Sequence, residues 1–407
     1  MAVPGRVVIV GAGLGGASAA ASLREQGFSG DVVVLGAEPQ RPYELPPLSK
    51  GLLLGDTDEP DWVREEGFWR DNDVDLRSGT HATRIELGAR LVDDGQGGRH
   101  AYDRLLLATG SQPRQLPVPG ADLPGVRMLR TLDDALALRG AMSDAKRMVI
   151  IGAGWIGTEA AAAGRRHGVE VTVVDQISAP LLSVLGPEVS RVFQDLHTEN
   201  GVRWQLGSGV AEVTGGPDGV RGVRLTDGTE LAADLVLVAV GVKPRVELAH
   251  QAGLELSDDG GVAVDATLRT AAPDVYAVGD IAAHFHPHYG RRVRVEHWAN
   301  AKNQGTHVAA NLLDAHEPYE RSPYFFSDQY TLGCEYRGLA DLDTDELVIR
   351  GDLAKREFIA FWLRDGKVTA AMNVNTWDDG DALKALVEGD MTVTANQLRD
   401  ADLNGLV

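Results

Sequence analysis

Apolar residues gather in two long stretches that follow the same order along the chain. Residues 7–10 form a β-branched run that leads into a glycine-rich turn and an alanine-rich stretch, and residues 148–151 begin the same series. A second β-branched run follows each alanine-rich stretch, at residues 32–35 and 171–174. This order predicts strand, turn, helix and strand in each copy, which is the pattern of a parallel sheet.

Each copy closes with a further apolar run that ends at a glycine. These runs cover residues 103–110 and 234–241. Continuous apolar runs of this kind are expected for strands that are buried on both faces. Before each closing strand, short alternating segments separated by glycine turns predict a β-meander. A third glycine-closed run, at residues 274–280, follows the second copy, and we interpret it as the chain returning to the first domain.

From about residue 322 the pattern changes. Short strands are predicted at 347–350, 358–362 and 367–371, followed by a short helix near 379–387. We therefore predict an α/β protein with two Rossmann-like dinucleotide-binding domains and a small C-terminal α+β domain. The first domain is predicted to be discontinuous (1–110 and 242–321), the second to span 111–241 and the third 322–407.

The turn in each copy carries the G-x-G-x-x-G pattern of dinucleotide-binding sites. One glycine forms the tight bend, one lets backbone approach a pyrophosphate, and one lets the helix pack on the strand. The start of the helix then offers unpaired N–H groups to phosphates. Because the pattern twice lies between an apolar strand and a helix, it favours two dinucleotide sites over nucleotide-free glycine turns. The first site contains Gly11, Gly13, Leu14, Gly15 and Gly16, and the second Gly152, Gly154, Ile156 and Gly157.

An acid about 20 residues beyond such a turn usually binds the ribose hydroxyls. In the second copy this acid is Asp175, and Gln176 rather than an arginine follows it. A 2′-phosphate would meet an unpaired carboxylate there, so NADH is expected in preference to NADPH. In the first copy the candidate is Glu38, which could instead be an exposed loop acid. A bound flavin and a visiting nicotinamide are the simplest explanation of two sites in one chain.

Charge and cysteine content narrow the class of protein. The 407 residues carry a formal net charge of −20, which opposes nucleic acid and acidic membranes as partners because like charges repel. We find no apolar run of membrane-spanning length, and the strand at 7–10 begins without a leader before it. The single cysteine, Cys334, excludes a disulfide framework and fits a reducing cytoplasm, where we expect the protein to be located.

Several short motifs resemble those of one flavoprotein family. They are the segments 46–50 (P-P-L-S-K), 107–110 (L-A-T-G), 130–135, 157–159, 296–301 and 325–329. Over nearly the whole chain, the sequence resembles the FAD-dependent ferredoxin reductases of the putidaredoxin reductase and aromatic-ring dioxygenase reductase type, which have a glutathione-reductase-like fold. Disulfide reductases of this fold carry a redox cysteine pair in the segment that corresponds to 42–50, where this chain has none. The resemblance therefore implies a flavin that delivers electrons without a thiol relay.

The resemblance also implies roles for individual residues. Lys50 would lie beside the flavin with Glu159 as its partner, because a fixed ammonium favours the negative charge of a reduced flavin and a buried lysine needs a counter-ion. Alternatively, Lys50 is an ordinary exposed helix lysine. Asp280 would hold the ribityl chain of FAD, and Trp298 would contact the flavin face or simply pack in the core. The other implied cofactor contacts are Pro46, Ala82, Thr109, Gly110, Arg130, Gly241 and Gly279.

Three positions depart from the family pattern. Ala37 stands where many relatives have the ribose-binding acid, so Glu38 would have to substitute for it. Leu45 stands where many relatives have an arginine that could meet the pyrophosphate. Phe326 replaces the usual tryptophan near the proposed electron exit, which leaves an aromatic ring without an indole N–H donor.

The sequence thus predicts an enzyme, an NADH:ferredoxin oxidoreductase. Hydride would pass from NADH to FAD, and single electrons would then pass to a small iron–sulfur ferredoxin that feeds a haem monooxygenase or a Rieske-type oxygenase. A rubredoxin is the alternative acceptor. A different class of function is a redox-sensing NADH-binding flavoprotein that resembles apoptosis-inducing factor.

Two further clusters allow more than one interpretation. His284, His286 and His288 alternate as metal ligands on a strand would, but Pro287 interrupts them and no carboxylate or thiolate completes a set, so we favour a solvated loop. The three arginines within 291–294 could form an ordinary charged hairpin or a docking patch for an acidic ferredoxin, and the sequence does not decide between these.

Overall fold

The computed structural model describes residues 4–407, which form two compact units. The chain passes between the units several times. The first unit contains the described residues up to Leu45 together with Asp61–Gln112 and Lys243–Pro323. The second contains Pro46–Pro60, Pro113–Val242 and Tyr324–Val407. Residues 46–60 therefore group with the second unit although they interrupt the first in sequence, and the boundaries of three domains remain a prediction.

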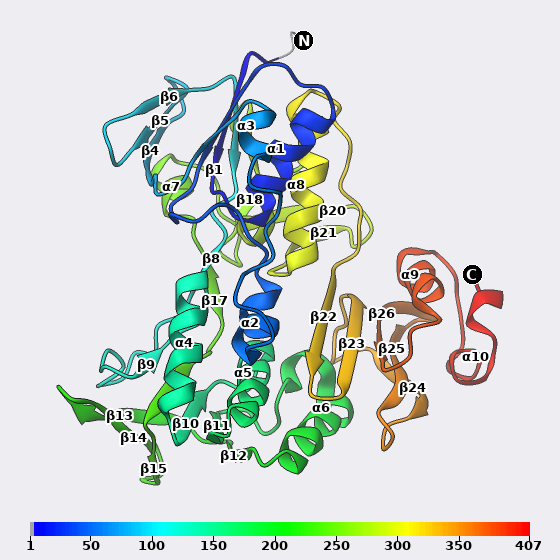
Figure 1. The fold of residues 1–407 in the computed structure, drawn as a ribbon. Coiled ribbons are helices and arrows are strands. Elements are labelled where there is room, and N and C mark those ends of the chain that lie inside the picture. The colour runs from blue at the N-terminus through cyan, green and yellow to red at the C-terminus, as the bar shows by residue number, and fades with distance from the viewer. Residues whose placement is uncertain (1–3) are drawn as a thin grey trace. The chain divides into compact units, whose positions relative to one another are not determined.

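A five-stranded parallel sheet forms the core of the first unit, in the order β19-β7-β1-β2-β3 (Figure 1). Most residues of its central strands are fully buried, as expected for a parallel sheet that is covered on both faces. β19 pairs with β7, so the chain does return to the first sheet after the second copy. The strands are β1 (Arg6–Val10), β2 (Asp31–Leu35), β3 (Val74–Arg77), β7 (Arg104–Leu107) and β19 (Val275–Ala277).

Two long helices of the first unit, α1 (Leu14–Glu25) and α8 (Trp298–Leu312), lie side by side (Figure 1). Small residues permit this approach, because a Cβ added to Gly305 would lie 2.2 Å from the carbonyl oxygen of Gly15. Two three-stranded sheets and several short helices complete the unit. They are β4 (Ala82–Glu86), β5 (Leu91–Asp94), β6 (Arg99–Ala101), β18 (Val262–Val264), β20 (Ala282–His286), β21 (Arg291–Arg294), α3 (Phe68–Asp71), α7 (Glu247–Gln251) and η2 (Gly279–Ile281). The sheet β4-β5-β6 is antiparallel, and the sheet β18-β20-β21 is mixed.

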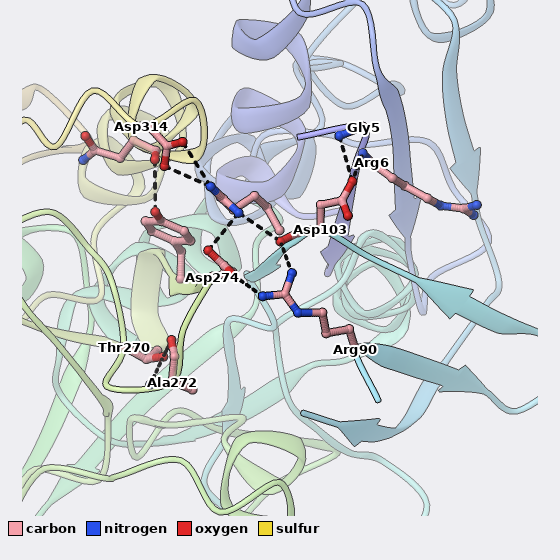
Figure 2. A network of polar contacts seen from close by, with 11 residues as sticks. Gly5, Arg6, Arg90, Asp103, Thr270, Ala272, Asp274 and Asp314 are labelled. Atoms are coloured by element: carbon pink, nitrogen blue, oxygen red, sulfur yellow. Dashed lines mark hydrogen bonds and ion pairs between the residues drawn. The ribbon is translucent and has the colours of Figure 1, made fainter. Parts of the chain in front are cut away.

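A buried arginine fixes the returning strand in the first unit. The Arg104 side chain, 8% exposed, pairs with Asp274 just before β19 at 2.8 Å and with Asp314 just after α8 at 2.9 Å. Figure 2 shows the two aspartates, Asp274 and Asp314, that pair with this guanidinium. Arg90 also pairs with Asp274 and donates a hydrogen bond to the carbonyl oxygen of Asp103 at 3.4 Å. The network therefore ties the start of β7 to segments that follow it by more than 150 residues.

The duplication extends to single side chains. Asp103, just before β7, accepts hydrogen bonds from the backbone N–H groups of Gly5 and Arg6 at 2.7 and 2.9 Å (Figure 2). Asp234 stands just before the corresponding strand of the second copy and accepts one from the N–H of Arg147 at 3.0 Å. In both copies a carboxylate thus fixes the start of the fingerprint strand to the start of the closing strand.

The second unit repeats the architecture with a sheet in the order β12-β11-β10-β16-β9. A β-meander lies between β12 and the closing strand β16 along the chain, as predicted. The sheet strands are β9 (Val126–Arg127), β10 (Arg147–Ile151), β11 (Glu170–Asp175), β12 (Arg203–Leu206) and β16 (Leu235–Val238). The meander is β13 (Val210–Gly216), β14 (Gly219–Leu225) and β15 (Glu230–Ala232). The helices are η1 (Pro46–Ser49), α2 (Gly51–Leu54), α4 (Leu132–Asp144), α5 (Trp155–Arg166) and α6 (Leu182–Glu199).

The C-terminal part of the second unit is an antiparallel sheet in the order β22-β23-β26-β25-β24. The predicted strands and the helix near 379–387 are confirmed, and two strands that precede them were not predicted. The elements are β22 (Tyr324–Gln329), β23 (Leu332–Gly338), β24 (Glu346–Asp352), β25 (Glu357–Arg364), β26 (Lys367–Val374), α9 (Gly380–Glu388), α10 (Ala395–Asp400) and η3 (Leu403–Gly405). Short strands β8 (Ser111–Pro113) and β17 (Val242–Pro244) lie where the sequence passes from one unit to the other.

The interpretation of the histidine cluster as a solvated loop is wrong for His284 and His286, whereas His288 does lie exposed in the turn after β20. His284 and His286 lie on β20, are 1% and 0% exposed, and share one face of the strand. Gln304 contacts the His284 ring nitrogen at 3.3 Å, and the carbonyl oxygen of Arg321 lies 3.1 Å from His286. The strand forms because β18 pairs with one of its edges and β21 with the other. The sequence does not reveal this strand, because its polar histidines do not look like strand residues. Burial lowers the pKa of His284 to about 3.

Between residues 4 and 407, helices long and apolar enough to cross a membrane are absent. Over the same range, the His, Cys, Asp and Glu side chains do not come together in groups of three that could hold a metal ion.

Candidate functional site

The glycines of the first fingerprint divide their roles as the sequence predicts. Gly11 has a φ of +112°, and a Cβ there would lie 2.2 Å from the carbonyl oxygen of Ala108. A Cβ on Gly16 would lie 2.0 Å from the carbonyl oxygen of Gly11. By contrast, a Cβ on Gly13 would meet no atom of the described chain within 4 Å. Two positions therefore build the turn and the helix contact, while the third faces open space in which a ligand can approach the backbone.

The second fingerprint has the same geometry. Gly152 has a φ of +113°, and a Cβ there would lie 2.3 Å from the carbonyl oxygen of Ala239. A Cβ on Gly157 would lie 2.0 Å from the Gly152 oxygen, whereas Gly154 faces a space free of described atoms within 4 Å. The first turns of α1 and α5 contain no acidic residue that would repel a phosphate. Both turns fit the pyrophosphate of a dinucleotide, which helix N–H groups would bind.

The two candidate ribose acids differ in their surroundings. Asp175 ends β11 and accepts hydrogen bonds from the N–H groups of Ala153, within the second fingerprint, at 2.7 Å and of Ile177 at 3.1 Å. These bonds hold the carboxylate beside the glycine turn. Glu38 lies in the loop after β2, where its carboxylate accepts a hydrogen bond from the hydroxyl of Tyr43. Glu38 is partly buried and bonded, so it is more ordered than an exposed loop acid.

Other predicted FAD contacts of the first unit cluster at the ends of β7 and β19. The Thr109 hydroxyl donates to the carbonyl oxygen of Arg245 at 2.6 Å. Asp280, in η2, accepts a hydrogen bond from the hydroxyl of Ser111. The N–H of Gly279 is bonded to the side-chain oxygen of Gln304 at 2.8 Å. Since the carboxyl ends of parallel strands are where α/β sheets bind ligands, this placement suits the predicted role.

Trp298 is the first residue of α8 and is half-buried. Its indole N–H donates to Glu44 at 2.8 Å, and the ammonium of Lys302 lies 4.8 Å from its ring centroid. Trp298 is therefore held by polar partners and is not plain core packing. Ala82, the predicted adenine contact, begins β4 in the same unit.

Lys50 and Glu159 form an ion pair within the second unit, with the ammonium nitrogen 2.7 Å from Oε1 of the carboxylate. The side chains are 16% and 4% exposed, so the alternative of an ordinary exposed lysine does not hold. Lys50 directly follows η1 and caps α2, whereas Glu159 lies in the second turn of α5. The ring centroid of Phe326 lies 5.3 Å from the Lys50 ammonium, which adds a cation–π contact.

The remaining predicted cofactor residues have these places in the fold. Leu14 and Gly15 lie in the first turn of α1, and Ile156 lies in the first turn of α5 and is 42% exposed. Pro46 begins η1, Arg130 precedes α4, and Gly241 follows β16 with a φ of +89°. Pro46, Lys50 and Arg130 all belong to the second unit.

The sequence did not identify the polar residues that surround Glu159. Ser49 and Ser327 both donate hydrogen bonds to its carboxylate, the latter at 2.7 Å. Gln329, on the same face of β22 as Ser327, bonds to Ser327 at 3.0 Å. One signal in the sequence could have indicated them. Ser327 and Gln329 stand at alternate positions, and alternate residues of a strand share a face, so both could point toward the same buried group.

The arginines within 291–294 are largely engaged inside the first unit. Arg292 donates to the carbonyl oxygens of Val264 and Ala283. Arg294 pairs with Glu296 and lies 3.7 Å from Asp259. The cluster therefore offers less uncompensated positive charge than its sequence suggests.

Comparison with known proteins places these sites in a family. Residues 5–305 match the family model described as pyridine nucleotide-disulphide oxidoreductase, and residues 324–404 match the one described as reductase C-terminal. Rhodocoxin reductase of Rhodococcus erythropolis is 37% identical over 98% of this chain and 93% of its own length. Putidaredoxin reductase of Pseudomonas putida is 36% identical over 97% and 94%. This chain belongs to the ferredoxin reductase family of pyridine nucleotide-disulphide oxidoreductases. It is therefore an oxidoreductase, as predicted.

Solved structures agree with this membership in the ferredoxin reductase family. A ferredoxin reductase from Rhodopseudomonas palustris superimposes with a TM-score of 0.94 at 38% identity, covering 98% of this chain and 99% of that one. Putidaredoxin reductase in covalent complex with putidaredoxin gives a TM-score of 0.93 at 35% identity, covering 98% and 97%. The predicted α/β fold with an α+β C-terminal part is thus confirmed.

The only cysteine of this ferredoxin reductase stands apart from redox chemistry. Cys334 lies on β23, is 1% exposed, and donates a hydrogen bond to the carbonyl oxygen of Ser327 at 3.5 Å. Burial raises the pKa of the thiol, and a thiol rather than a thiolate is a poor nucleophile. No thiol relay of the disulfide-reductase kind can be built on this residue.

Proposed function

We propose that this protein is an NADH:ferredoxin oxidoreductase that contains FAD and delivers electrons to an iron–sulfur protein of an oxygenase system. The proposal rests above all on one observation: two fingerprints of equal geometry occur in a chain whose single cysteine is buried and protonated. Relatives over nearly full length support it, since they are named rhodocoxin reductase, putidaredoxin reductase and anthranilate 1,2-dioxygenase ferredoxin reductase.

The second fingerprint is assigned to NADH. The α5 N-terminus and Gly154 would bind the pyrophosphate, and the Asp175 carboxylate would accept hydrogen bonds from the ribose hydroxyls. Gln176, which is exposed, provides no positive charge for a 2′-phosphate. The carboxylate would instead repel that phosphate, so the site favours NADH over NADPH.

The first fingerprint is assigned to FAD, with Glu38, Thr109 and Asp280 as polar contacts. When bound, the flavin of FAD accepts a hydride and releases electrons one at a time, which suits a one-electron acceptor. The role proposed for Lys50 is to hold a fixed positive charge where negative charge develops. Glu159 orients that ammonium at 2.7 Å and compensates its charge, because a buried charge without a counter-ion is costly.

Stopped-flow absorbance would test the proposal. The purified protein is mixed with NADH, and the reduced protein is then mixed with ferredoxins and, separately, with a rubredoxin. Rapid loss of flavin absorbance followed by reoxidation with a ferredoxin is the expected result. Reoxidation by the rubredoxin alone would change the assigned acceptor. Slow reduction, with a persistent long-wavelength band and indifference to every iron–sulfur protein, would contradict the reductase role.

The role of Lys50 can be tested by Lys50→Ala. The variant is expected to retain FAD and to be reduced by NADH at least about tenfold more slowly, since a charged hydrogen bond or ion pair of this kind is worth roughly 1.5–3 kcal/mol. The measurement is the rate of flavin reduction at saturating NADH. A rate equal to that of the unmodified protein would remove Lys50 from the mechanism.

A further inference from the structure

Strand β22 presents a polar face to the interior of the second unit. Ser327 and Gln329 are each 1% exposed, whereas Asp328 between them is exposed. Polar side chains that are buried to this degree are costly unless their hydrogen-bonding groups are satisfied. Ser327 has a partner on α5, and Gln329 has partners on α5 and α6.

The carboxylate of Glu159 fixes the direction of these hydrogen bonds. A carboxylate paired with an ammonium can only accept, so the Ser327 hydroxyl, 2.7 Å from Oε1, must donate its proton to it. Ser327 can then only accept from Gln329, whose Nε2 lies 3.0 Å away. The amide of Gln329 therefore turns its NH₂ group toward Ser327.

The second donor of Gln329 agrees with this direction. Its Nε2 also lies 3.1 Å from the hydroxyl of Thr158, and that hydroxyl donates in turn to the carbonyl oxygen of Gly154 or Trp155. Those two carbonyls belong to the cap and first residue of α5, where the NADH fingerprint begins its helix. One amide thus bonds to both the Glu159 network and the fingerprint helix.

The last link is a histidine that is fully buried. With its NH₂ group committed, Gln329 presents Oε1 to His197, whose Nε2 lies 2.7 Å away and must carry a proton. Nδ1 of His197 is buried and has no hydrogen-bond partner among the described residues. Burial lowers the pKa of His197 to about 4, so the ring stays neutral at pH 7 with its single proton on Nε2.

We propose that Ser327 and Gln329 are positioning residues of the reductase, which act through Glu159 on Lys50. His197, Gln329 and Ser327 form a chain in which every donor points toward the carboxylate. Hydrogen bonds aligned in this way polarise one another and stabilise the negative charge at their end. The chain holds the Glu159 carboxylate in one orientation, and so keeps the Lys50 ammonium in place for the hydride transfer. This inference rests on the proposed function, because it assumes that Lys50 acts in flavin reduction.

The direction of the chain can be measured without any turnover. The protein has 11 histidines, and ¹⁵N NMR of ¹⁵N-histidine-labelled holoprotein distinguishes protonated from unprotonated ring nitrogens. His197 is expected to show a protonated Nε2 and an unprotonated Nδ1 at pH 7. A proton on Nδ1 alone would overturn the proposal, since Nε2 could then only accept, and Gln329 would have to donate to His197 or lose its bond to it. The result stands whether or not the protein reduces a ferredoxin.

Ser327→Ala tests the effect on Lys50. It is expected to slow flavin reduction at saturating NADH about tenfold, while the dissociation constant for NADH changes less than about twofold. Ser327→Thr keeps the hydroxyl and should restore the rate. An unchanged rate of flavin reduction in the alanine variant, or a loss that the threonine variant does not restore, would contradict the proposal.

Ser190→Ala is the matched control. Ser190 is a fully buried serine of α6 in the same unit, and its hydroxyl lacks a hydrogen-bond partner within residues 4–407. Its removal should leave the rate of flavin reduction unchanged. A combined variant gives a further check: in a Glu159→Gln background, Ser327→Ala should cause no additional slowing. Independent, multiplying effects would show that Ser327 does not act through Glu159.

Discussion

At the scale of single residues, we propose that the carboxylate that ends β11 sets the preference between NADH and NADPH. Asp175 is held against the fingerprint by the N–H of Ala153, so its charge stays where a ribose would lie. The double variant Asp175→Ala, Gln176→Arg replaces this charge with a guanidinium that can bind a phosphate bidentately. We expect the ratio of kcat/KM for NADPH to that for NADH to rise at least about tenfold, which corresponds to about 1.4 kcal/mol. Steady-state kinetics with both coenzymes measures it, and an unchanged ratio would reject Asp175 as the ribose ligand.

Buried histidines predict an acid-sensitive fold. Burial lowers the pKa values of His197 and His297 to about 4, whereas an unfolded histidine titrates near 6.5. Between these values the unfolded state binds more protons, so stability is complete above about pH 6.5 and declines as the pH falls toward 4. Each histidine contributes up to roughly 3 kcal/mol to this decline.

His197→Gln isolates one share of the effect. A glutamine at this position can still donate a hydrogen bond to Gln329 but does not titrate. The melting temperature of the variant should therefore fall less steeply than that of the unmodified protein between pH 6.5 and pH 4. Thermal unfolding at a series of pH values gives the comparison, and equal slopes would mean that His197 is not buried in its neutral form.

Local geometry decides which residues the sequence can reveal. The fingerprint glycines were predictable because the turn itself requires glycine. Gly11 has a positive φ, and a Cβ on Gly16 would collide with the Gly11 oxygen, so the glycines recur at fixed spacing. The partners of Glu159 were not, since Ser49 and Ser327 come from segments 110 and 168 residues away. The pairing of Lys50 with Glu159 was predicted only from the family resemblance.

At the scale of elements, Arg104 holds the returning strand β19 against β7. Removing one partner of a buried ion pair leaves a charge without compensation and typically costs about 3–5 kcal/mol. Arg104→Leu removes the ion pair of Asp314, whereas Asp274 keeps its pair with Arg90. We expect a loss of about 3 kcal/mol in the free energy of unfolding, the lower end of the range because both aspartates are partly exposed. Denaturant titration followed by circular dichroism measures it.

Arg147→Leu provides the control for this prediction. Arg147 pairs with Asp234 at the corresponding place in the second copy, but the two side chains are 48% and 38% exposed. Exposed pairs of this kind contribute at most about 1 kcal/mol. Similar losses for both variants would show that burial of Arg104 has no special importance.

Element prediction succeeded where a segment's own pattern is strong. β1, β7, β10 and β16 are uninterrupted apolar runs, and such runs are identified without knowledge of their neighbours. β20 was misjudged as a loop because its histidines are buried by partners that come from other segments. β22 was missed for the same reason, since its serine and glutamine are satisfied by helices far away in sequence.

At the scale of the whole molecule, the C-terminal sheet and helix α6 share one apolar core. Leu185 and Phe193 of α6 pack in a single cluster with Tyr336, Phe358 and Trp362 of the sheet. A chain truncated after residue 323 would expose that face of α6. We expect the truncated protein to aggregate or to bind a hydrophobic dye, and to recover when the segment 324–407 is co-expressed. Size-exclusion chromatography provides the measurement, and a stable, monodisperse truncated protein would contradict the shared core.

The assignment of chain segments to the two compact units was the least predictable feature of the fold. Nothing local in residues 46–60 indicates that they belong with a unit whose main segments begin at Pro113 and Tyr324. Such groupings depend on contacts between distant segments, for example the ion pair of Lys50 with Glu159. A single sequence records these contacts only through the residue types that they require.

The late arrival of β19 has a consequence for how the protein is made. β7 ends at Leu107, and its neighbour β19 begins at Val275, roughly 170 residues later in synthesis. At about 5–20 residues per second, a ribosome needs roughly 10–30 s to cover that distance. Throughout this interval, one edge of β7 offers unpaired N–H and C=O groups beside an apolar surface. Newly made chains are therefore most prone to pair with one another before the second half of the molecule has left the ribosome.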